Sequence, residues 1–272
     1  EGARLTIRGV ASCEHLRFRV RWQHDWFGIE GGLEVGDEVI DLRMLMKAIE
    51  RSPAGFVPLD DGSFLSLTEE FRRKLGDLAA YAARGKDAAG FHPLALFPLD
   101  ALRDEVGRFE MDGTAQARYE AFRQALSLEP EVPPAFQAEL RDYQLEGFRW
   151  LVRLAAMGVG ACLADDMGLG KTIQALALLV HRAAEGPALV VAPTSVCMNW
   201  ASEAERFAPT LNVILLNRDR GLSIQDRKPF DVLVVSYGLL LQEQEALSSQ
   251  RWSTIVLDEA QAIKNVSAKR TG

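Results

Sequence analysis

One short stretch constrains the fold more than any other: a glycine loop that lies between an apolar run and an apolar helical pattern. Residues 161–164 are apolar and predict a short buried strand, and Gly168-Leu-Gly-Lys-Thr172 follows them. The apolar residues after the loop repeat at helical spacing: Ile173, Leu176, Ala177 and Val180. Glycines let the backbone turn tightly and point its N–H groups inward, and the positive end of a helix favours an anion. The stretch therefore predicts a phosphate-binding loop between a strand and a helix.

The loop nearly meets the pattern G-x-x-x-x-G-K-[ST], but Asp165 replaces the first glycine. In that pattern Lys171 would reach the β- and γ-phosphates, and the Thr172 hydroxyl would hold Mg²⁺. A plain strand-to-helix turn with an N-terminal lysine is the alternative. The order of strand, loop and helix favours the phosphate loop.

A second motif lies at Thr254-Ile-Val-Leu-Asp-Glu-Ala-Gln261, where two carboxylates directly follow an apolar strand pattern. Asp258 would hold Mg²⁺, mostly through water, and Glu259 would orient and polarise the water that attacks the γ-phosphate. Two acids at a strand end are also common as a solvated edge. Their presence together with the glycine loop favours a nucleotide site.

The chain has 272 residues, of which 48% are hydrophobic, and this allows one or two domains with a large core. Three prolines in Glu129-Pro-Glu-Val-Pro-Pro134 predict a boundary between residues 1–134 and 135–272. Beyond it, helical patterns alternate with apolar runs, which is typical of a parallel sheet with crossover helices. The expected strands are 161–164, 188–192, 213–216, 232–236 and 254–257.

Residues 1–134 predict a smaller α+β domain. Turns at Gly36-Asp37 and Asp61-Gly62 indicate hairpins, and Thr68 is expected to cap a helix. Trp26 and Phe27 are expected in the core, residues 92–98 are expected to be extended, and residues 115–126 are expected to form a helix that buries Leu126. Arg17, Arg19 and Arg21 alternate with apolar residues and would form one strand face, which suits a solvated face better than a nucleic-acid surface.

Charge and cysteine content narrow the class of protein. The net charge is −7; residues 1–139 hold 24 acidic and 17 basic side chains, and residues 140–272 hold 14 of each, so nucleic-acid binding would need a local patch. The three cysteines, at 13, 162 and 197, fit neither a disulfide framework nor a zinc site, which favours a reducing cytoplasm. No run of about 18 apolar residues predicts a membrane span. A start at Glu1 without Met suggests a piece of a longer protein.

The motifs of residues 139–272 together resemble the Swi/Snf family of helicase-like ATPases in helicase superfamily two. The matching segments are Leu140-Arg-Asp-Tyr-Gln144, Ala164-Asp-Asp-Met-Gly-Leu-Gly-Lys-Thr172, Ala192-Pro-Thr-Ser-Val-Cys-Met-Asn-Trp200, Ser236-Tyr237 and Asp258-Glu-Ala-Gln-Ala-Ile-Lys-Asn265. In this family the aspartate at position 165 is the usual variant of the loop. The resemblance implies the first RecA-like lobe, a parallel sheet with helices on both faces.

The resemblance also implies a function: an ATP hydrolase that uses ATP and Mg²⁺ to move along double-stranded DNA, with arginine fingers supplied by a second RecA-like lobe. Lys171, Asp258 and Glu259 would be catalytic, and Thr172 and Asp258 would hold the metal. The implied nucleotide-binding residues are Arg141, Gln144, Asp166, Met167, Gly168, Leu169, Gly170, Lys171 and Thr172. The implied DNA-binding residues are Pro193, Thr194, Ser195, Ser236 and Tyr237. Gln144 would pair with the N6 and N7 atoms of adenine, which prefers ATP over GTP.

Residues 1–138 look like the accessory region of bacterial members, through Asp25-Trp-Phe, a hairpin at Gly31-Gly32 and Leu59-Asp-Asp-Gly-Ser-Phe64. This part could bind a protein partner. Two other functions stay open: a strand-separating helicase, which Asn199-Trp200 and Lys264-Asn265 disfavour, and a nucleotide-gated interaction module.

Overall fold

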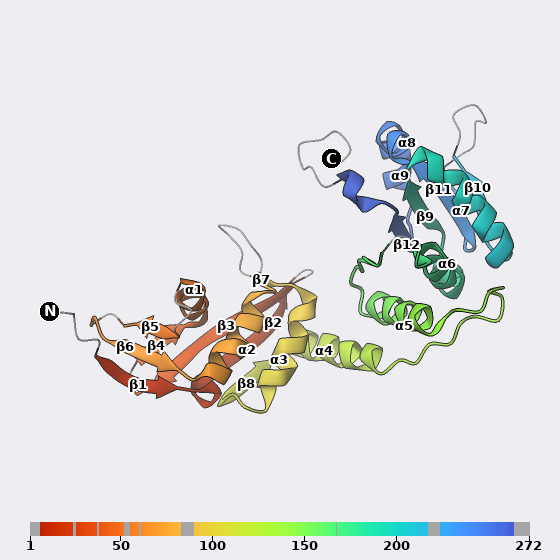
Figure 1. The fold of residues 1–272 in the computed structure, drawn as a ribbon. Helices are drawn as coiled ribbons and strands as arrows, with labels where there is room; N and C mark the ends of the chain where they lie inside the picture. The colour runs from red at the N-terminus through yellow and green to blue at the C-terminus, as the bar shows by residue number, and fades with distance from the viewer. Residues whose placement is uncertain are drawn as a thin grey trace. The chain divides into compact units, whose positions relative to one another are not determined.

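The computed structural model describes residues 6–23, 26–36, 38–51, 55–59, 61–82, 90–166, 168–216 and 224–263. The chain divides into two compact units, Glu1–Ser127 and Leu128–Gly272. The first unit holds the elements from β1 to α4, and the second holds those from α5 to β12 (Figure 1). The division lies just before the proline run at 129–134.

The first unit contains two small sheets with helices packed against them. One sheet has the order β4-β3-β2-β8, with β7 beside β3, and the other has the order β1-β6-β5. The elements are β1 (Ile7–Ala11), β2 (Leu16–Gln23), β3 (Trp26–Val35), β4 (Glu38–Asp41), α1 (Leu42–Arg51), β5 (Phe56–Pro58), β6 (Phe64–Leu67), α2 (Glu69–Ala79), β7 (Gly90–Phe91), α3 (Leu96–Arg103), β8 (Arg108–Met111) and α4 (Gly113–Leu126). This unit is α+β.

Local turn and cap chemistry accounts for several of these elements. Strands β3 and β4 pair antiparallel around Gly36, which has a φ of +62°, and β5 and β6 pair around Gly62, with a φ of +81°. The Thr68 hydroxyl accepts a hydrogen bond from the backbone N–H of Phe71 and caps α2. Both hairpins and the capped helix are confirmed. Asp25, Asp37 and Asp60 lie outside the described residues.

Four local expectations for this unit are wrong. Gly31 and Gly32 lie inside β3 rather than in a turn; a Cβ on Gly31 would lie 1.9 Å from the carbonyl oxygen of Arg17 on the paired strand, so glycine lets the backbones approach. Residues 92–98 are not extended, because His92 caps a 3₁₀ turn that leads into α3. Trp26 is 43% exposed and Leu126 is 38% exposed, because each lies on the outer side of its element.

The arginines of β2 form a face that is neutralised by neighbouring strands. Beneath them Leu16, Phe18 and Val20 are buried. The ion pairs are Arg17–Glu34 at 3.2 Å, Arg19–Glu110 at 2.8 Å and Arg21–Glu30 at 3.7 Å. Since each arginine meets a carboxylate of β3 or β8, the face carries little net positive charge. The paired, partly exposed side chains are what a solvated face requires; that this face does not bind nucleic acid stays a prediction.

The second unit is an α/β layer structure built on a fully parallel sheet. Its strand order is β10-β11-β9-β12, and the register pairs Val190 with both Val234 and Val256. The elements are α5 (Asp142–Ala156), α6 (Lys171–Arg182), β9 (Ala188–Ala192), α7 (Thr194–Phe207), β10 (Asn212–Leu215), β11 (Asp231–Ser236), α8 (Tyr237–Gln242), α9 (Gln244–Ser249), β12 (Thr254–Leu257) and a final 3₁₀ turn, Ala260–Ile263.

Helices cover both faces of this sheet (Figure 1). On one face, Val190 and Val234 pack in a core with side chains of α5, α6 and α7. On the other face, Val191 and Val235 pack with residues of α8 and α9. Every residue of β9 is buried, as a central strand covered on both sides requires. The expected parallel sheet with helices on both faces is confirmed.

The first of the five expected strands is absent. Residues 161–164 have no regular structure, and Ala161, Cys162 and Ala164 are exposed. Of the four side chains only that of Leu163 is half-buried, so the segment buries too little apolar area to offset the roughly 1–2 kcal/mol per residue that ordering the backbone costs. Strand β12 therefore ends the described sheet, and its Ile255 and Leu257 are 58% and 42% exposed.

Residues 128–140, which begin the second unit, pack against its helices. Phe136 is buried in its core, and the Gln137 N–H donates to the carbonyl oxygen of Phe207 at 2.7 Å. Arg153 of α5 donates to the Leu128 carbonyl at 2.8 Å and pairs with Glu129 at 2.7 Å. The proline run is thereby fixed to α5. Among the described helices, none is both long and apolar enough to cross a membrane.

Candidate nucleotide site

The two sequence motifs converge on the carboxyl edge of the parallel sheet. Helix α6 leads through 186–187 into β9, so its N-terminus lies at the edge where β9, β11 and β12 end. Twelve helical residues span about 18 Å, close to the length of a five- or six-residue strand. Lys171 at the start of α6 and Asp258 after β12 therefore face the same edge, where open α/β sheets bind ligands.

The glycine loop has the backbone that a phosphate loop needs. Gly168 and Gly170 have φ values of +85° and +75°, a left-handed conformation that side chains disfavour. Gly170 is the N-cap of α6, and the first turn of this helix holds no acidic side chain. The first N–H groups of a helix have no intrahelical acceptor, so an anion is favoured here. The Lys171 ammonium donates to the carbonyl oxygens of Asp165 at 2.8 Å and Asp166 at 3.0 Å.

Helix α5 braces the loop through the segment that resembles an adenine reader. The Gln144 amide donates to the Leu169 carbonyl at 3.1 Å, and its oxygen accepts from the Arg141 N–H at 3.0 Å. The Tyr143 hydroxyl also donates to the Leu169 carbonyl, at 3.2 Å. Gln144 is only 8% exposed. One amide hydrogen and one oxygen lone pair remain for a base, so its expected contact with adenine stays a prediction.

Gln174 is a site neighbour that sequence reasoning missed. It is fully buried, and its amide donates to the Gly170 carbonyl at 3.4 Å. No described residue donates to its side-chain oxygen. That oxygen lies against Gly147 of α5, where a Cβ would be 1.9 Å away. The available signal was a glutamine on the apolar side of the helix that follows the loop.

Asp258 is held by three elements of the sheet edge. Its backbone N–H donates to the Val191 carbonyl at 2.8 Å, which continues the ladder of β9 and β12. Trp200 of α7 donates its indole N–H to the Oδ2 atom of Asp258 at 2.8 Å, and Tyr237 of α8 donates its hydroxyl to the Asp258 carbonyl at 2.8 Å. The Oδ1 atom accepts from the Glu259 N–H at 2.9 Å.

Glu259 has an unusual backbone for its residue type. Its φ is +51°, a left-handed conformation that costs a non-glycine residue of order 1 kcal/mol or more. Its carboxylate accepts a hydrogen bond from the Gln261 amide. Such strain persists where the surrounding structure fixes it, and it clusters at functional sites.

The negative charge of Asp258 perturbs the groups around it. Burial and, second, the Asp258 charge raise the pKa of Glu203, which lies one turn beyond Trp200 on α7. The same two causes raise the pKa of the Tyr237 hydroxyl. Burial raises the pKa of the Cys197 thiol, with Asp258 adding to it. This edge of the sheet therefore concentrates acidic groups around one carboxylate.

The expected DNA-binding residues divide into two groups. Thr194 and Ser195 are exposed at the start of α7, and Pro193 is half-buried before them. Ser236 is buried, and its hydroxyl accepts from the Leu239 N–H at 3.3 Å to cap α8. Tyr237 is 5% exposed, and its hydroxyl is committed to Asp258. Side chains of the first group face solvent, whereas the Tyr237 hydroxyl faces inward and cannot reach a phosphate in this structure.

The residues present suit Mg-ATP. Thr172 offers a hydroxyl in the first turn of α6, and Asp258 offers a carboxylate whose oxygens each accept only one hydrogen bond among the described residues. Among described residues no three His, Cys, Asp or Glu side chains cluster as metal ligands. Mg²⁺ is usually bound by one or two protein oxygens, water and phosphates, and Thr172 and Asp258 offer such oxygens. Met167, Lys264 and Asn265 lie outside the described residues.

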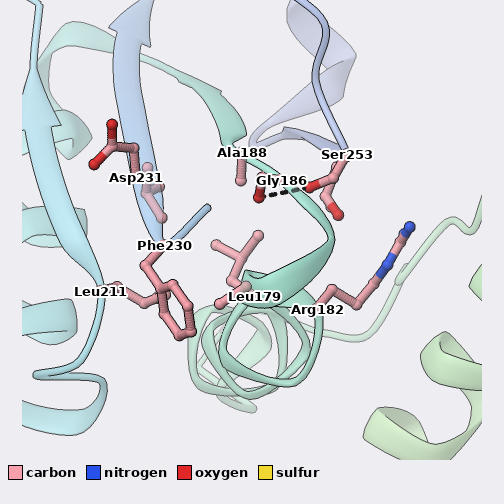
Figure 2. A pocket seen from close by; sticks show the side chains of 11 residues that line it. Leu179, Arg182, Gly186, Ala188, Leu211, Phe230, Asp231 and Ser253 are labelled. Atoms are coloured by element: carbon pink, nitrogen blue, oxygen red, sulfur yellow. Dashed lines mark hydrogen bonds between the residues drawn. The ribbon is translucent and has the colours of Figure 1, made fainter. Parts of the chain in front are cut away.

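A small cavity lies at the opposite edge of the sheet and is separate from this site. Figure 2 shows it between Leu179 and Arg182 of α6, Asp231 of β11 and Ser253, which precedes β12. Its volume is about 10 Å³, room for about one water molecule. The Ser253 hydroxyl donates to the Gly186 carbonyl at 3.0 Å across it. The cavity cannot hold a nucleotide.

Comparisons with known proteins find relatives of the second unit. Residues 143–272 match the model of the SNF2-related domain. YwqA of Bacillus subtilis, provisionally named an ATP-dependent helicase/translocase, is 47% identical over 151 residues, which cover 53% of this chain and 16% of that protein. Helicase SWR1 of Saccharomyces cerevisiae is 38% identical over 178 residues, which cover 62% of this chain and 12% of that protein.

Among solved structures, the Sulfolobus solfataricus SWI2/SNF2 ATPase core in complex with dsDNA is 40% identical, with a TM-score of 0.47. The match covers 53% of this chain and 30% of that one. The chain thus spans less than one third of the length of each of these three relatives.

Proposed function

We propose that this chain, whose residues 143–272 match the model of the SNF2-related domain, is the nucleotide-binding lobe of an ATP-dependent motor that moves along double-stranded DNA. The observation that carries the proposal is the convergence of two motifs. The left-handed glycines and Lys171 begin α6 at the edge where Asp258 and Glu259 follow β12. Relatives named as ATPases and helicases support ATP hydrolysis at the level of the family.

The roles of the side chains follow from their chemistry and position. The free N–H groups of the loop and of the first turn of α6 would bind the phosphates, with Lys171 leaving the Asp165 and Asp166 carbonyls for the phosphate oxygens. Thr172 and Asp258 would hold Mg²⁺, which neutralises charge on the β- and γ-phosphates. Glu259 would orient the attacking water. Tyr143 and Gln144 link α5 to the loop, so adenine binding there would stiffen the phosphate site.

A second lobe of the intact protein would complete the enzyme. An arginine finger is typically worth on the order of 10³- to 10⁵-fold in the rate of phosphoryl transfer. No such arginine is assigned at this edge among the described residues. Thr194 and Ser195, at the exposed start of α7, would contact one DNA strand, and the other lobe would supply the remaining contacts. The first unit is proposed to bind a protein partner, since its β2 arginines are already paired.

The direct test of the nucleotide site is Lys171→Ala with Lys47→Ala as its control. Lys47 is an exposed lysine of α1 in the first unit, so its loss matches the charge change without touching the loop. We expect Lys171→Ala to weaken Mg-ATP binding in calorimetry and to abolish turnover in the intact protein, and Lys47→Ala to do neither. Equal Mg-ATP affinity in both variants would show that the phosphate-loop assignment is wrong.

Two rival functions predict different binding. A strand-separating helicase would be stimulated by single strands or RNA rather than by duplex DNA. A nucleotide-gated interaction module would bind Mg-ATP without nucleic-acid stimulation, and its partner affinity would change with nucleotide.

A further inference from the structure

The carboxylate expected to hold Mg²⁺ is fixed by a side chain from the helix expected to contact DNA. Trp200 donates to the Oδ2 atom of Asp258 at 2.8 Å, from a position 58 residues earlier in the sequence. The indole is 2% exposed and lies in the core formed by α5, α6 and α7. Its only hydrogen-bond donor therefore points at the carboxylate that is expected to hold Mg²⁺.

We propose that Trp200 is a positioning residue that couples the start of α7 to the orientation of the Asp258 carboxylate, and hence DNA contact to Mg²⁺ binding. The proposal rests on the proposed function. Thr194 and Ser195 are exposed at the first turn of α7. Trp200 lies six residues after Thr194, about 9 Å along the same helix. A rigid helix of 14 residues transmits a displacement of its first turn to the indole N–H.

The geometry makes Asp258 sensitive to such a displacement. One oxygen accepts from Trp200 and the other from the Glu259 N–H, so the plane of the carboxylate is set by two donors on different elements. The Tyr237 hydroxyl fixes the Asp258 carbonyl at 2.8 Å, and the Val191 carbonyl fixes its N–H. The backbone of Asp258 is therefore held by β9 and α8, while one of its two carboxylate oxygens is held by α7. Partners that orient a metal-binding carboxylate commonly contribute 10- to 100-fold to metal affinity.

Trp200→Phe tests the coupling, because it keeps an aromatic ring in the core and removes only the N–H donor and part of the ring. Trp252→Phe is the matched control: its indole N–H donates to the Leu247 carbonyl of α9 at 2.9 Å rather than to Asp258. Both variants lose one indole hydrogen bond within the same unit. Thermal unfolding of each variant measures what that loss does to stability alone.

The readout is the free Mg²⁺ concentration that gives half-maximal binding of a fluorescent, non-hydrolysable ATP analogue to the intact protein, with and without duplex DNA. We expect Trp200→Phe to raise this concentration about 10- to 100-fold and Trp252→Phe to leave it unchanged. In the parent protein, duplex DNA should lower this Mg²⁺ concentration, because coupling between two binding sites is reciprocal. Trp200→Phe should remove that shift.

Tyr237→Phe gives a second measurement that removes only a hydroxyl, and it carries the test if Trp200→Phe fails to fold. It should also raise the Mg²⁺ concentration, since it frees the Asp258 carbonyl.

Equal Mg²⁺ dependence in Trp200→Phe and Trp252→Phe would overturn the proposal, as would a DNA-induced shift that survives Trp200→Phe or an unchanged Tyr237→Phe. A parent protein that binds no Mg-nucleotide would instead overturn the proposed function, and the inference with it.

Discussion

Gly147 in α5 is where the packing behind the phosphate loop can be tested most sharply. In an ordinary helix interior, Gly→Ala stabilises by about 0.8–1.0 kcal/mol, because glycine loses more backbone entropy on folding. At Gly147 the added Cβ would lie 1.9 Å from the Gln174 side-chain oxygen and 3.1 Å from its Cδ atom. Ordinary contact is about 3.4 Å, so one of the two groups must move by roughly 1.5 Å.

A shift of the Gln174 side chain would disturb its contact with the loop. Gln174 is fully buried, and it contacts the Gly170 carbonyl through its amide. Overpacking of this kind typically costs 1–3 kcal/mol, which exceeds or cancels the gain in helix propensity. We therefore expect Gly147→Ala to destabilise the second unit by up to about 2 kcal/mol and to weaken nucleotide binding, because the strain falls between α5 and the loop.

Gly76→Ala is the matched control. Gly76 lies inside α2, and a Cβ there would meet nothing within 4 Å. This variant should stabilise the first unit by about 0.5–1 kcal/mol and leave nucleotide affinity unchanged. Urea unfolding followed by circular dichroism measures the stability of both variants. Each variant is compared with the unfolding transition of the same unit in the parent protein. The double variant Gly147→Ala/Gln174→Ala should recover part of the loss, since the two side chains contact each other.

A Gly147→Ala protein as stable as the parent, or more stable, would refute the close contact between α5 and α6 on which this reasoning depends.

Three further predictions concern ATP hydrolysis and the acidic side chains near Asp258. Glu259→Gln should keep Mg-ATP binding and lose hydrolysis, because the amide keeps the shape but cannot act as a carboxylate toward water; calorimetry with phosphate release separates the two effects. Residues 1–272 alone should hydrolyse little or no ATP and show no duplex stimulation, since the proposed arginine finger lies elsewhere; robust duplex-stimulated turnover would contradict this. Glu203→Gln should raise the melting temperature at pH 7. The folded-state pKa of Glu203 is raised, so the parent protein loses stability as pH rises through that pKa. The difference in melting temperature between variant and parent should vanish in acid, where Glu203 is protonated in both states.

Local chemistry made much of the fold predictable. The hairpins around Gly36 and Gly62 and the Thr68 cap depend on residues within a few positions of one another. Uninterrupted apolar runs in the sequence predict the buried strands β9 and β11. The motif residues Lys171 and Asp258 lie at the same edge of the sheet, because β9 and β12 are parallel and α6 runs antiparallel to the strand that follows it.

The expectations that are wrong concern residues whose environment depends on neighbours far along the chain. Gly31 and Gly32 look like a turn in sequence, yet the close approach of Arg17 and Ile40 on adjacent strands is what requires them. Whether Trp26 is buried depends on which side of its strand is covered. Trp200 and Asp258 are 58 residues apart, and nothing in the sequence pairs an indole with one particular carboxylate. Residues 161–164 are apolar but too small to secure a strand by themselves.

The central claim is that this unit powers movement on duplex DNA, and the steady-state ATPase rate of the intact protein tests it most directly. The rate should be measured without nucleic acid, with duplex DNA, with single-stranded DNA and with RNA, at one moderate salt concentration, because phosphate contacts weaken steeply with salt. We expect duplex DNA to stimulate the ATPase rate strongly and Lys171→Ala to abolish that stimulation. Stimulation by single strands or RNA alone, or by no nucleic acid at all, would contradict the claim.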